Sequence, residues 1–267
     1  MATRGEFLPD TEDLLYERQG AIAFLTFNRP QARNALTWPM YEGLYACCEH
    51  VDADERVKVL VLRGAGDRAF VAGTDISQFR AFSTREDALT YERNNNRYAS
   101  RLEAVAKPTI AMLRGACTGG GAVFALCCDL RVVAPDVRFG VPIASTLGNT
   151  LSMQNFARLV ALIGPARTKE LIFTARLIGA EEGRAMGVFN EIVDLDRLEA
   201  RTLELAETLA SNAPLTIRSA KLSIQRVLDR QRIEEDEDLM LMCYLSEDFH
   251  EGVNAFLEKR RPAWQGR

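Results

Sequence analysis

The distribution of apolar and polar residues predicts that strands and helices alternate along the first part of the chain. Apolar runs rich in branched residues predict strands, and apolar residues at helical spacing predict helices. Strands are expected at 22–27, 57–62, 109–113, 130–134 and 138–140, a loop at 65–79, and helices at 38–51, 84–105 and 119–128. Because continuously apolar strands alternate with helices, the pattern indicates an α/β fold with mainly parallel strands.

From about residue 152 the pattern becomes helical. Helices are expected at 152–162, 165–174, 180–186, 197–211, 214–230 and 236–258. A boundary near 195–205 therefore divides an α/β core, residues 1–200, from a C-terminal helical region, residues 201–267. The last helix has an apolar face, which fits packing within the chain as well as a subunit interface. Its members include Leu239, Met240, Met242, Cys243 and Leu245.

Composition and charge narrow the class of protein. The 267 residues are 47% hydrophobic and 26% charged, which suits one large domain or a domain with an appendage. A net charge of −4 argues against a nucleic-acid partner. No apolar run reaches the ~18 residues that a membrane span needs. Residues 1–18 are polar and lack an apolar centre, so no secretory signal is expected.

The cysteines and histidines indicate neither disulfides nor a metal site. The six cysteines have no disulfide or zinc spacing, so we expect small buried side chains in a reducing compartment, the cytoplasm. The two histidines, His50 and His250, lie away from the glycine-rich segments. A histidine-based triad or metal centre is therefore not expected.

Two glycine-containing segments follow predicted strands and are the main candidates for chemistry. Gly119, Gly120 and Gly121 begin the predicted helix 119–128, where unpaired N–H groups and a partial positive charge favour an anion. Gly73-Thr74 lies in the predicted loop 65–79. Two main-chain amides aimed at one oxygen form an oxyanion hole. Taken singly, the glycine run fits close helix–strand packing equally well, and the second segment fits any tight turn. The run lacks the spacing of a nucleotide-binding loop.

Several motifs in one order resemble the enoyl-CoA hydratase/isomerase (crotonase) superfamily, and the resemblance covers about residues 15–264. Three motifs carry most of it: Asn28-Arg29-Pro30-Gln31-Ala32-Arg33-Asn34-Ala35-Leu36, Ala69-Phe70-Val71-Ala72-Gly73-Thr74-Asp75-Ile76, and Lys107-Pro108 through Gly115-Ala116-Cys117-Thr118-Gly119-Gly120-Gly121 to Cys128-Asp129-Leu130-Arg131. Phe139-Gly140-Val141-Pro142, Gly164, Gly187-Val188-Phe189-Asn190 and the segment 251–260 follow in family order.

The resemblance implies a fold, a substrate and a set of site residues. The fold is a spiral of ββα units with a C-terminal helical region that covers the site and joins subunits into trimers, often paired as hexamers. The substrate is an acyl-CoA thioester, whose oxygen receives the amides of Thr74 and Gly120 as an enolate forms. Coenzyme A enters as part of the substrate, and no other cofactor is implied. Its expected contacts are Ala32, Arg33, Ala72, Asp75 and Ile76, with Arg33 on a phosphate and Lys259 reaching over from a neighbouring subunit. Either cation by itself also fits an ordinary solvated surface charge.

The sequence departs from the family where hydratases carry two glutamates. Val123 and Ile143 occupy those positions, or Ala144 if an inserted residue shifts the second one. None of these side chains transfers a proton. No carboxylate occurs from Arg138 through Ile163. Substitutes to consider are Glu92 or Glu103 on the 84–105 helix, a carboxylate of the substrate, Cys117, and the polar residues Ser145, Thr146, Asn149, Thr150 and Ser152.

Three functions fit these residues. The first is an enzyme of the enoyl-CoA hydratase/isomerase type with altered proton transfer, acting as an adapted hydratase, an isomerase or a C–C lyase. The second is a non-catalytic paralogue that binds acyl-CoA. The third is an acyl-CoA thioester hydrolase that uses activated water.

Overall fold

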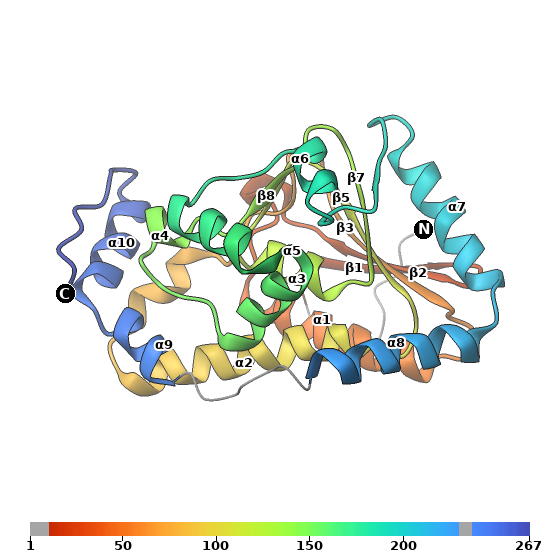
Figure 1. The fold of residues 1–267 in the computed structure, drawn as a ribbon, viewed down its shortest axis with the longest axis horizontal. Helices are drawn as coiled ribbons and strands as arrows, with labels where there is room; N and C mark the ends of the chain where they lie inside the picture. The colour runs from red at the N-terminus through yellow and green to blue at the C-terminus, as the bar shows by residue number, and fades with distance from the viewer. Residues whose placement is uncertain (1–10, 230–236) are drawn as a thin grey trace.

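The computed structural model describes residues 11–229 and 237–267 (Figure 1), which form two sheets. The larger sheet has six strands in the order β1-β2-β3-β5-β7-β9. β1 pairs antiparallel with β2, and every later neighbour pairs parallel. Their bounds are β1 Leu14–Gln19, β2 Ile22–Phe27, β3 Val59–Gly64, β5 Thr109–Leu113, β7 Leu130–Val133 and β9 Glu191–Ile192. The predicted α/β class with mainly parallel strands is confirmed.

The smaller sheet contains the parallel strands β4-β6-β8, with β4 Ala69–Val71, β6 Ala116–Thr118 and β8 Arg138–Gly140. Each turn of the chain adds one strand to the large sheet, one to the small sheet, and then a helix. The turns are β3-β4-α2, β5-β6-α3 and β7-β8-α4, where α2 is Arg85–Glu103, α3 is Gly120–Cys127 and α4 is Ile143–Thr146. This succession is the spiral of ββα units that the resemblance implies.

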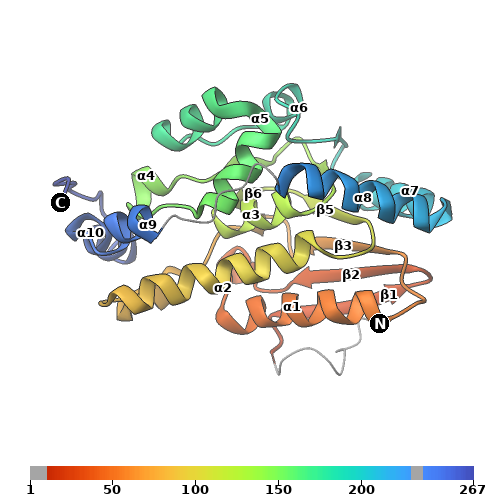
Figure 2. The same ribbon diagram turned by 60° about the horizontal axis from the view of Figure 1, so that its bottom comes forward.

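The main core lies between the two sheets and the helices that cover them. α1 (Trp38–Ala53) and α2 lie side by side (Figure 2). Phe27 of β2 contacts Phe70 of β4 and Phe124 of α3, with ring centroids 5.5 and 6.2 Å apart. β2 is buried along its whole length because helices cover both faces of the sheet.

α7 (Leu198–Ser211) covers the other face of the large sheet and packs on β2, β3, β5 and β7. The predicted division at residue 200 therefore falls inside a helix that packs on the core sheet, and the division stays a prediction. α8 (Pro214–Asp229) follows and buries none of its described residues. α5 (Met153–Thr174) and α6 (Ala180–Ala185) connect the last unit to β9. None of the helices in the described part of the chain is long and apolar enough to cross a bilayer.

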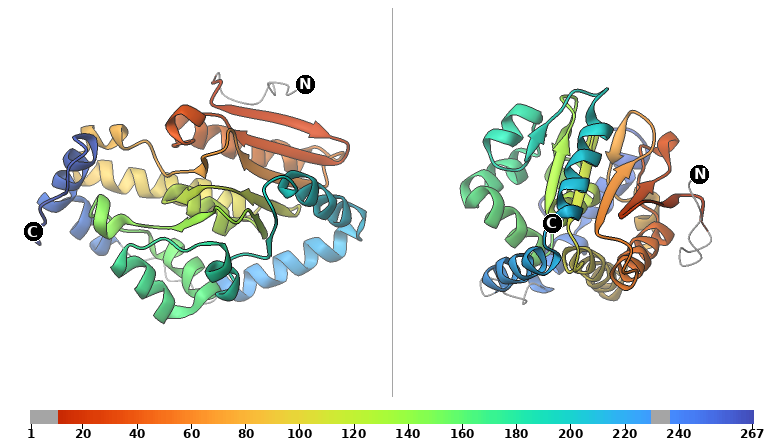
Figure 3. Two further views of the ribbon diagram at one scale, coloured as in Figure 1. Left: turned by 90° about the horizontal axis from the view of Figure 1, so that it is seen from above. Right: turned by 90° about the vertical axis from the view of Figure 1, so that its right-hand side faces the viewer.

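The last two helices lie at the opposite end of the molecule from α7 (Figure 3). α9 (Glu237–Tyr244) packs on α2, and α10 (Glu247–Leu257) packs on α4 and on the 3₁₀ helix η2 (Ile76–Ala81). An apolar cluster joins these elements, and it includes Phe79, Tyr91, Met240, Tyr244 and Phe249. After leaving the large sheet, the chain thus returns to the N-terminal part of α2.

Several elements differ from the sequence-based expectations. β1 lies in the N-terminal stretch treated as polar, because only Leu14 and Tyr16 of that strand are buried. The expected loop 65–79 contains β4 and most of η2. The strand expected at 57–62 forms two residues later. β6, β9 and α4 have two to four residues each, too few for periodicity to reveal.

One expected break between helices is present in the structure, and one expected continuous helix is interrupted. The expected break between 162 and 165 is confirmed, because Gly164 has a non-helical backbone with φ of 76°. The expected helix 236–258 is two helices: α9 ends at Tyr244, and the Ser246 hydroxyl caps α10 by accepting the Phe249 N–H at 3.0 Å. Residue 236, and residue 230 at the end of the expected helix 214–230, lie outside the described residues.

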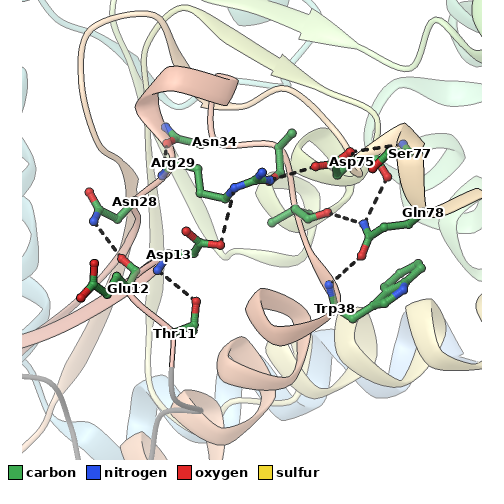
Figure 4. Close-up of polar contacts among 12 residues, drawn as sticks. Thr11, Glu12, Asp13, Asn28, Arg29, Asn34, Trp38, Asp75, Ser77 and Gln78 are labelled. Carbon is green, nitrogen blue, oxygen red and sulfur yellow. Dashed lines mark hydrogen bonds and ion pairs between the residues drawn. The ribbon is translucent and has the colours of Figure 1, made fainter. Parts of the chain in front are cut away.

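Asn34 connects the chain after β2 to the chain around β4. Its side chain is fully buried and its φ is 57°, a left-handed conformation that asparagine tolerates. Its oxygen accepts the Arg29 N–H at 2.9 Å, as Figure 4 shows. Its amide nitrogen donates to the carbonyls of Ala65 at 3.0 Å and Ala69 at 2.9 Å. One buried side chain thus holds two connecting segments in place.

We predict that Asn34→Asp destabilises the protein. Aspartate keeps the size and the backbone preference, but it removes both donors and sets a carboxylate against two buried carbonyls. The expected loss is about 2–4 kcal/mol in the free energy of unfolding, measured by urea denaturation. Asn28→Asp is the matched control, because Asn28 donates one exposed hydrogen bond to Glu12. It should cost less than about 1 kcal/mol. Equal losses in the two variants would contradict the role of Asn34.

Candidate active site

A cavity of about 520 Å³ lies where the ends of the small-sheet strands meet α2, α4 and α10. Of the ten positions assigned from the family resemblance, nine lie in its wall: Ala32, Arg33, Ala72, Thr74, Asp75, Ile76, Gly120, Val123 and Ile143. Lys259 is not among the described wall residues. It is exposed after the end of α10, although Phe256 of that helix does line the cavity.

The segment around Thr74 is held by backbone hydrogen bonds to the chain before α1. The Leu36 N–H donates to the Gly73 carbonyl at 2.8 Å, and the Asp75 N–H donates to the Leu36 carbonyl at 2.9 Å. In a parallel bridge of this kind, the N–H of the residue between those two groups points the other way. The Thr74 amide therefore faces away from Leu36.

The start of α3 is pressed against the same segment. Gly120 is the first residue of α3, so its N–H has no partner within the helix. Gly119 precedes it with φ of 54°, a conformation that favours glycine, and its N–H donates to the Gly140 carbonyl at 3.0 Å. A Cβ on Gly121 would lie 2.2 Å from the Val71 carbonyl oxygen. Only glycine permits this approach, and Gly120 lines the cavity beside Thr74.

Two tyrosine hydroxyls hold the Thr74 side chain. Its Oγ1 shares hydrogen bonds with the hydroxyl of Tyr41 at 2.7 Å and with that of Tyr91 at 3.3 Å. Burial raises the pKa of both tyrosines well above the ordinary value, and the carboxylate of Glu92 adds to the effect. Both hydroxyls are therefore protonated near neutral pH. No sequence motif pointed to these two tyrosines. Both lie on predicted helices, where regularly spaced apolar and aromatic residues usually indicate packing.

Asp75 lies in the wall but is engaged by its own neighbours (Figure 4). Its carboxylate caps η2 by accepting from the Ser77 N–H at 3.2 Å and hydroxyl at 2.7 Å, and it pairs with Arg29 at 3.2 Å. Burial by itself raises the pKa of Asp75, but these hydrogen bonds and the Arg29 charge outweigh it and leave the pKa below its usual value. Arg29 also bonds the Ala35 carbonyl at 2.6 Å, so it orders the rim of the cavity.

The structure separates the two acidic residues proposed on the 84–105 helix. Glu92 lies in the cavity wall with 3% of its surface exposed, and its Oε1 accepts the Tyr244 hydroxyl at 2.5 Å. Glu103 pairs with Arg158 at 2.8 Å and is not among the described wall residues. Val123 and Ile143, also nearly buried, supply apolar surface to the wall.

The polar residues proposed between 145 and 152 have mostly local roles. Thr146 lines the cavity, but its hydroxyl donates to the Pro142 carbonyl, as does that of the exposed Ser145. The Ser152 hydroxyl is buried and donates to Asn96 at 2.6 Å. Asn149 and Thr150 line the cavity, and the Asn149 amide donates to the Tyr244 hydroxyl at 3.1 Å.

Cys117 is unsuited to act as a nucleophile. It is fully buried in β6, and burial raises the pKa of its thiol well above the ordinary value, so the reactive thiolate does not form near neutral pH. His50 and His250 are not among the described wall residues. In the described ranges, no group of three or more histidine, cysteine, aspartate or glutamate side chains could hold a metal ion.

Comparison with known proteins decides the family. A family model described as enoyl-CoA hydratase/isomerase matches residues 17–267. The chain belongs to the enoyl-CoA hydratase/isomerase family. The short-chain-enoyl-CoA hydratase of Clostridium acetobutylicum is 32% identical over 255 residues, which cover 94% of this chain and 97% of the relative. The 2,3-dehydroadipyl-CoA hydratase of Escherichia coli is 31% identical and covers 96% of this chain and 99% of its own.

Solved structures of similar proteins have the same fold. A methylmalonyl-CoA decarboxylase in complex with 2-nitronate-propionyl-CoA superimposes with a TM-score of 0.88 at 28% identity, covering 96% of this chain and 99% of that one. An enoyl-CoA hydratase/carnithine racemase from Magnetospirillum magneticum superimposes with a TM-score of 0.80 at 33% identity, covering 98% of both chains.

In this enoyl-CoA hydratase/isomerase family member, we predict that a thiol reagent such as DTNB modifies at most one thiol per folded chain. Cys47, Cys48, Cys117, Cys127 and Cys128 are buried, whereas Cys243 is partly exposed. All six thiols should react after denaturation. The Cys243→Ser variant should lose the reaction of the folded protein. A fast reaction that survives in this variant would show that a buried thiol, Cys117 included, is reachable.

Proposed function

We propose that the protein is an acyl-CoA-processing enzyme that stabilises a thioester enolate between the main-chain amides of Thr74 and Gly120. One observation carries this proposal: the two residues lie in the wall of the same cavity, with the Thr74 amide turned away from Leu36 and the Gly120 amide outside the helix ladder. Two relatives are named as hydratases of short-chain enoyl-CoA and of 2,3-dehydroadipyl-CoA, and this supports the substrate class.

The arrangement suits the chemistry of an enolate. Negative charge develops on the thioester oxygen when the enolate forms, and fixed amides stabilise that charge without having to reorganise. The partial positive charge at the start of α3 adds to this effect. Removing one donor from such a site typically costs about 3–4 kcal/mol of barrier. Rigidity therefore matters, and the Thr74 side chain is held by Tyr41 and Tyr91.

The coenzyme A part of the substrate would lie along the rim formed by Ala32, Arg33, Ala72, Asp75 and Ile76. Arg33 supplies a positive charge to the wall and suits a phosphate. We assign Lys259 to the coenzyme A of a neighbouring copy in a trimer or a dimer of trimers. Exposed apolar side chains of α8 support such an assembly, and they include Leu215, Ile224 and Val227.

The proposed reaction type depends on which side chains line the cavity. The family resemblance puts the two hydratase acids at Val123 and Ile143, so we do not expect efficient hydration of a simple 2-enoyl-CoA. Isomerisation or C–C cleavage through the enolate suits this wall better. Likeness to a methylmalonyl-CoA decarboxylase supports cleavage as the second candidate.

A panel of assays distinguishes these reactions. Enoyl-thioester absorbance reports hydration or isomerisation, CO₂ release reports decarboxylation, and a thiol reagent reports hydrolysis. Binding without any turnover indicates a non-catalytic paralogue.

We predict that Gly120→Pro abolishes most enolate formation, because proline is tolerated at the first position of a helix but has no N–H. The new Cβ would also lie 2.9 Å from the Tyr41 hydroxyl, so the control must carry the same Cβ. The readout is deuterium incorporation at the α-carbon of butyryl-CoA in deuterated buffer, followed by mass spectrometry. The expected loss of rate is about 10²- to 10³-fold. Gly120→Ala is the control, since its Cβ meets Tyr41 and Thr74 in the same way while the N–H stays, and it should lose much less of the exchange rate. Exchange at the wild-type rate in a folded Gly120→Pro protein would show that the Gly120 amide is not a donor.

A further inference from the structure

A buried carboxylate lies in the cavity wall at a position where neither family glutamate is expected. Glu92 is on α2, directly after Tyr91, whose hydroxyl bonds the Thr74 side chain. Both Thr74 and Glu92 line the cavity. Two successive residues of α2 therefore contribute to the same cavity. Tyr91 holds the side chain of Thr74, whose amide is a proposed donor, and Glu92 provides an acidic group.

Glu92 differs from the other carboxylate of the wall. Among the described wall residues, the acidic side chains are Asp75 and Glu92. Asp75 is stabilised as an anion by Ser77 and Arg29, and this makes it a weak proton acceptor. Glu92 is buried and accepts the hydroxyl of Tyr244, which belongs to the apolar cluster with Phe79 and Phe249. A carboxylate in such surroundings is suited to exchange a proton with a bound ligand.

The Tyr244 hydroxyl is directed at Glu92 by a third residue. The Asn149 amide nitrogen, which can only donate, bonds the Tyr244 oxygen at 3.1 Å, so the tyrosine hydrogen is left for the Glu92 oxygen at 2.5 Å. Tyr244 is buried at the end of α9, which packs on α2. The C-terminal helices thus complete the site by fixing one oxygen of the Glu92 carboxylate.

We propose that Glu92 is the catalytic residue that moves the proton at the α-carbon of the acyl group, and that Tyr244 is its positioning residue. This inference rests on the proposed enolate chemistry of the same cavity. In the forward step the α C–H bond breaks, its electron pair enters the enolate, and the proton forms an O–H bond with Glu92. In the reverse step the O–H bond breaks and the proton returns to carbon, so no further reactant is needed.

The test follows deuterium entering the α-carbon of butyryl-CoA, together with the Kd of butyryl-CoA from calorimetry. Glu92→Gln keeps the size of the side chain and removes its basicity. We expect a loss of exchange rate of about 10²- to 10⁴-fold, the usual contribution of a positioned acid or base, with Kd changed less than about threefold. Glu86→Gln is the matched control, because Glu86 lies on the exposed first turn of the same helix.

Tyr244→Phe tests positioning separately from stability. It should lower the maximal exchange rate about tenfold without changing Kd. If Tyr244 acts through Glu92, the double variant Glu92→Gln/Tyr244→Phe should be no slower than Glu92→Gln. A purely structural role would instead make the two losses multiply.

The outcomes separate the two proposals. Wild-type exchange in Glu92→Gln, with exchange lost in Gly120→Pro, overturns the role of Glu92 and leaves the oxyanion hole in place. A wild-type protein that binds butyryl-CoA but exchanges no α-proton also overturns the role of Glu92. Exchange that survives in Gly120→Pro but disappears in Glu92→Gln overturns the Gly120 donor instead. A protein that binds no CoA thioester overturns the proposed function itself.

Discussion

The site depends on the contact between the start of α3 and the backbone that follows β4. Gly121 lies so close to the Val71 carbonyl that any side chain on it would collide with main-chain atoms. On its other side the same segment is bonded to Leu36. Because backbone meets backbone on both sides, the main chain at Thr74 is fixed by hydrogen bonds and close packing, while Tyr41 and Tyr91 hold its side chain. This rigidity is what a preorganised pair of amides requires.

The cavity combines that backbone frame with helices from distant parts of the chain. α1 and α2 bring Tyr41, Tyr91 and Glu92, and α9 brings Tyr244, which the chain adds only after it has left the core sheet. Burial keeps the tyrosines protonated, since their pKa values lie above the ordinary value. They can therefore donate hydrogen bonds next to an acidic side chain. The proposed chemistry is thus divided between a fixed backbone that stabilises charge and a helix that moves a proton.

The apolar residues at 123 and 143 give the cavity a different character from one lined by an acid pair. Val123 and Ile143 supply apolar surface to the wall, and in the proposed chemistry the acidic function lies with Glu92. Water addition needs a held water molecule and two groups to activate it, whereas formation of an enolate needs one proton acceptor and a stabilised oxygen. A family fold can in this way keep its charge-stabilising frame while its proton chemistry changes.

The sequence by itself determined the strands β2 and β5, the long helices α1 and α2, the break at Gly164, and the motifs that identify the family, because continuous apolar runs, helical spacing and glycine requirements are local signals. It also supplied the wall residues that lie inside those motifs. Only the tertiary structure decided that Glu92 lines the cavity while Glu103 pairs with Arg158. It also decided that Tyr41 and Tyr91 line the cavity and that Tyr244 bonds Glu92. Those assignments depend on which face of a helix meets which distant partner, and helix periodicity is the same for a packing residue as for a functional one.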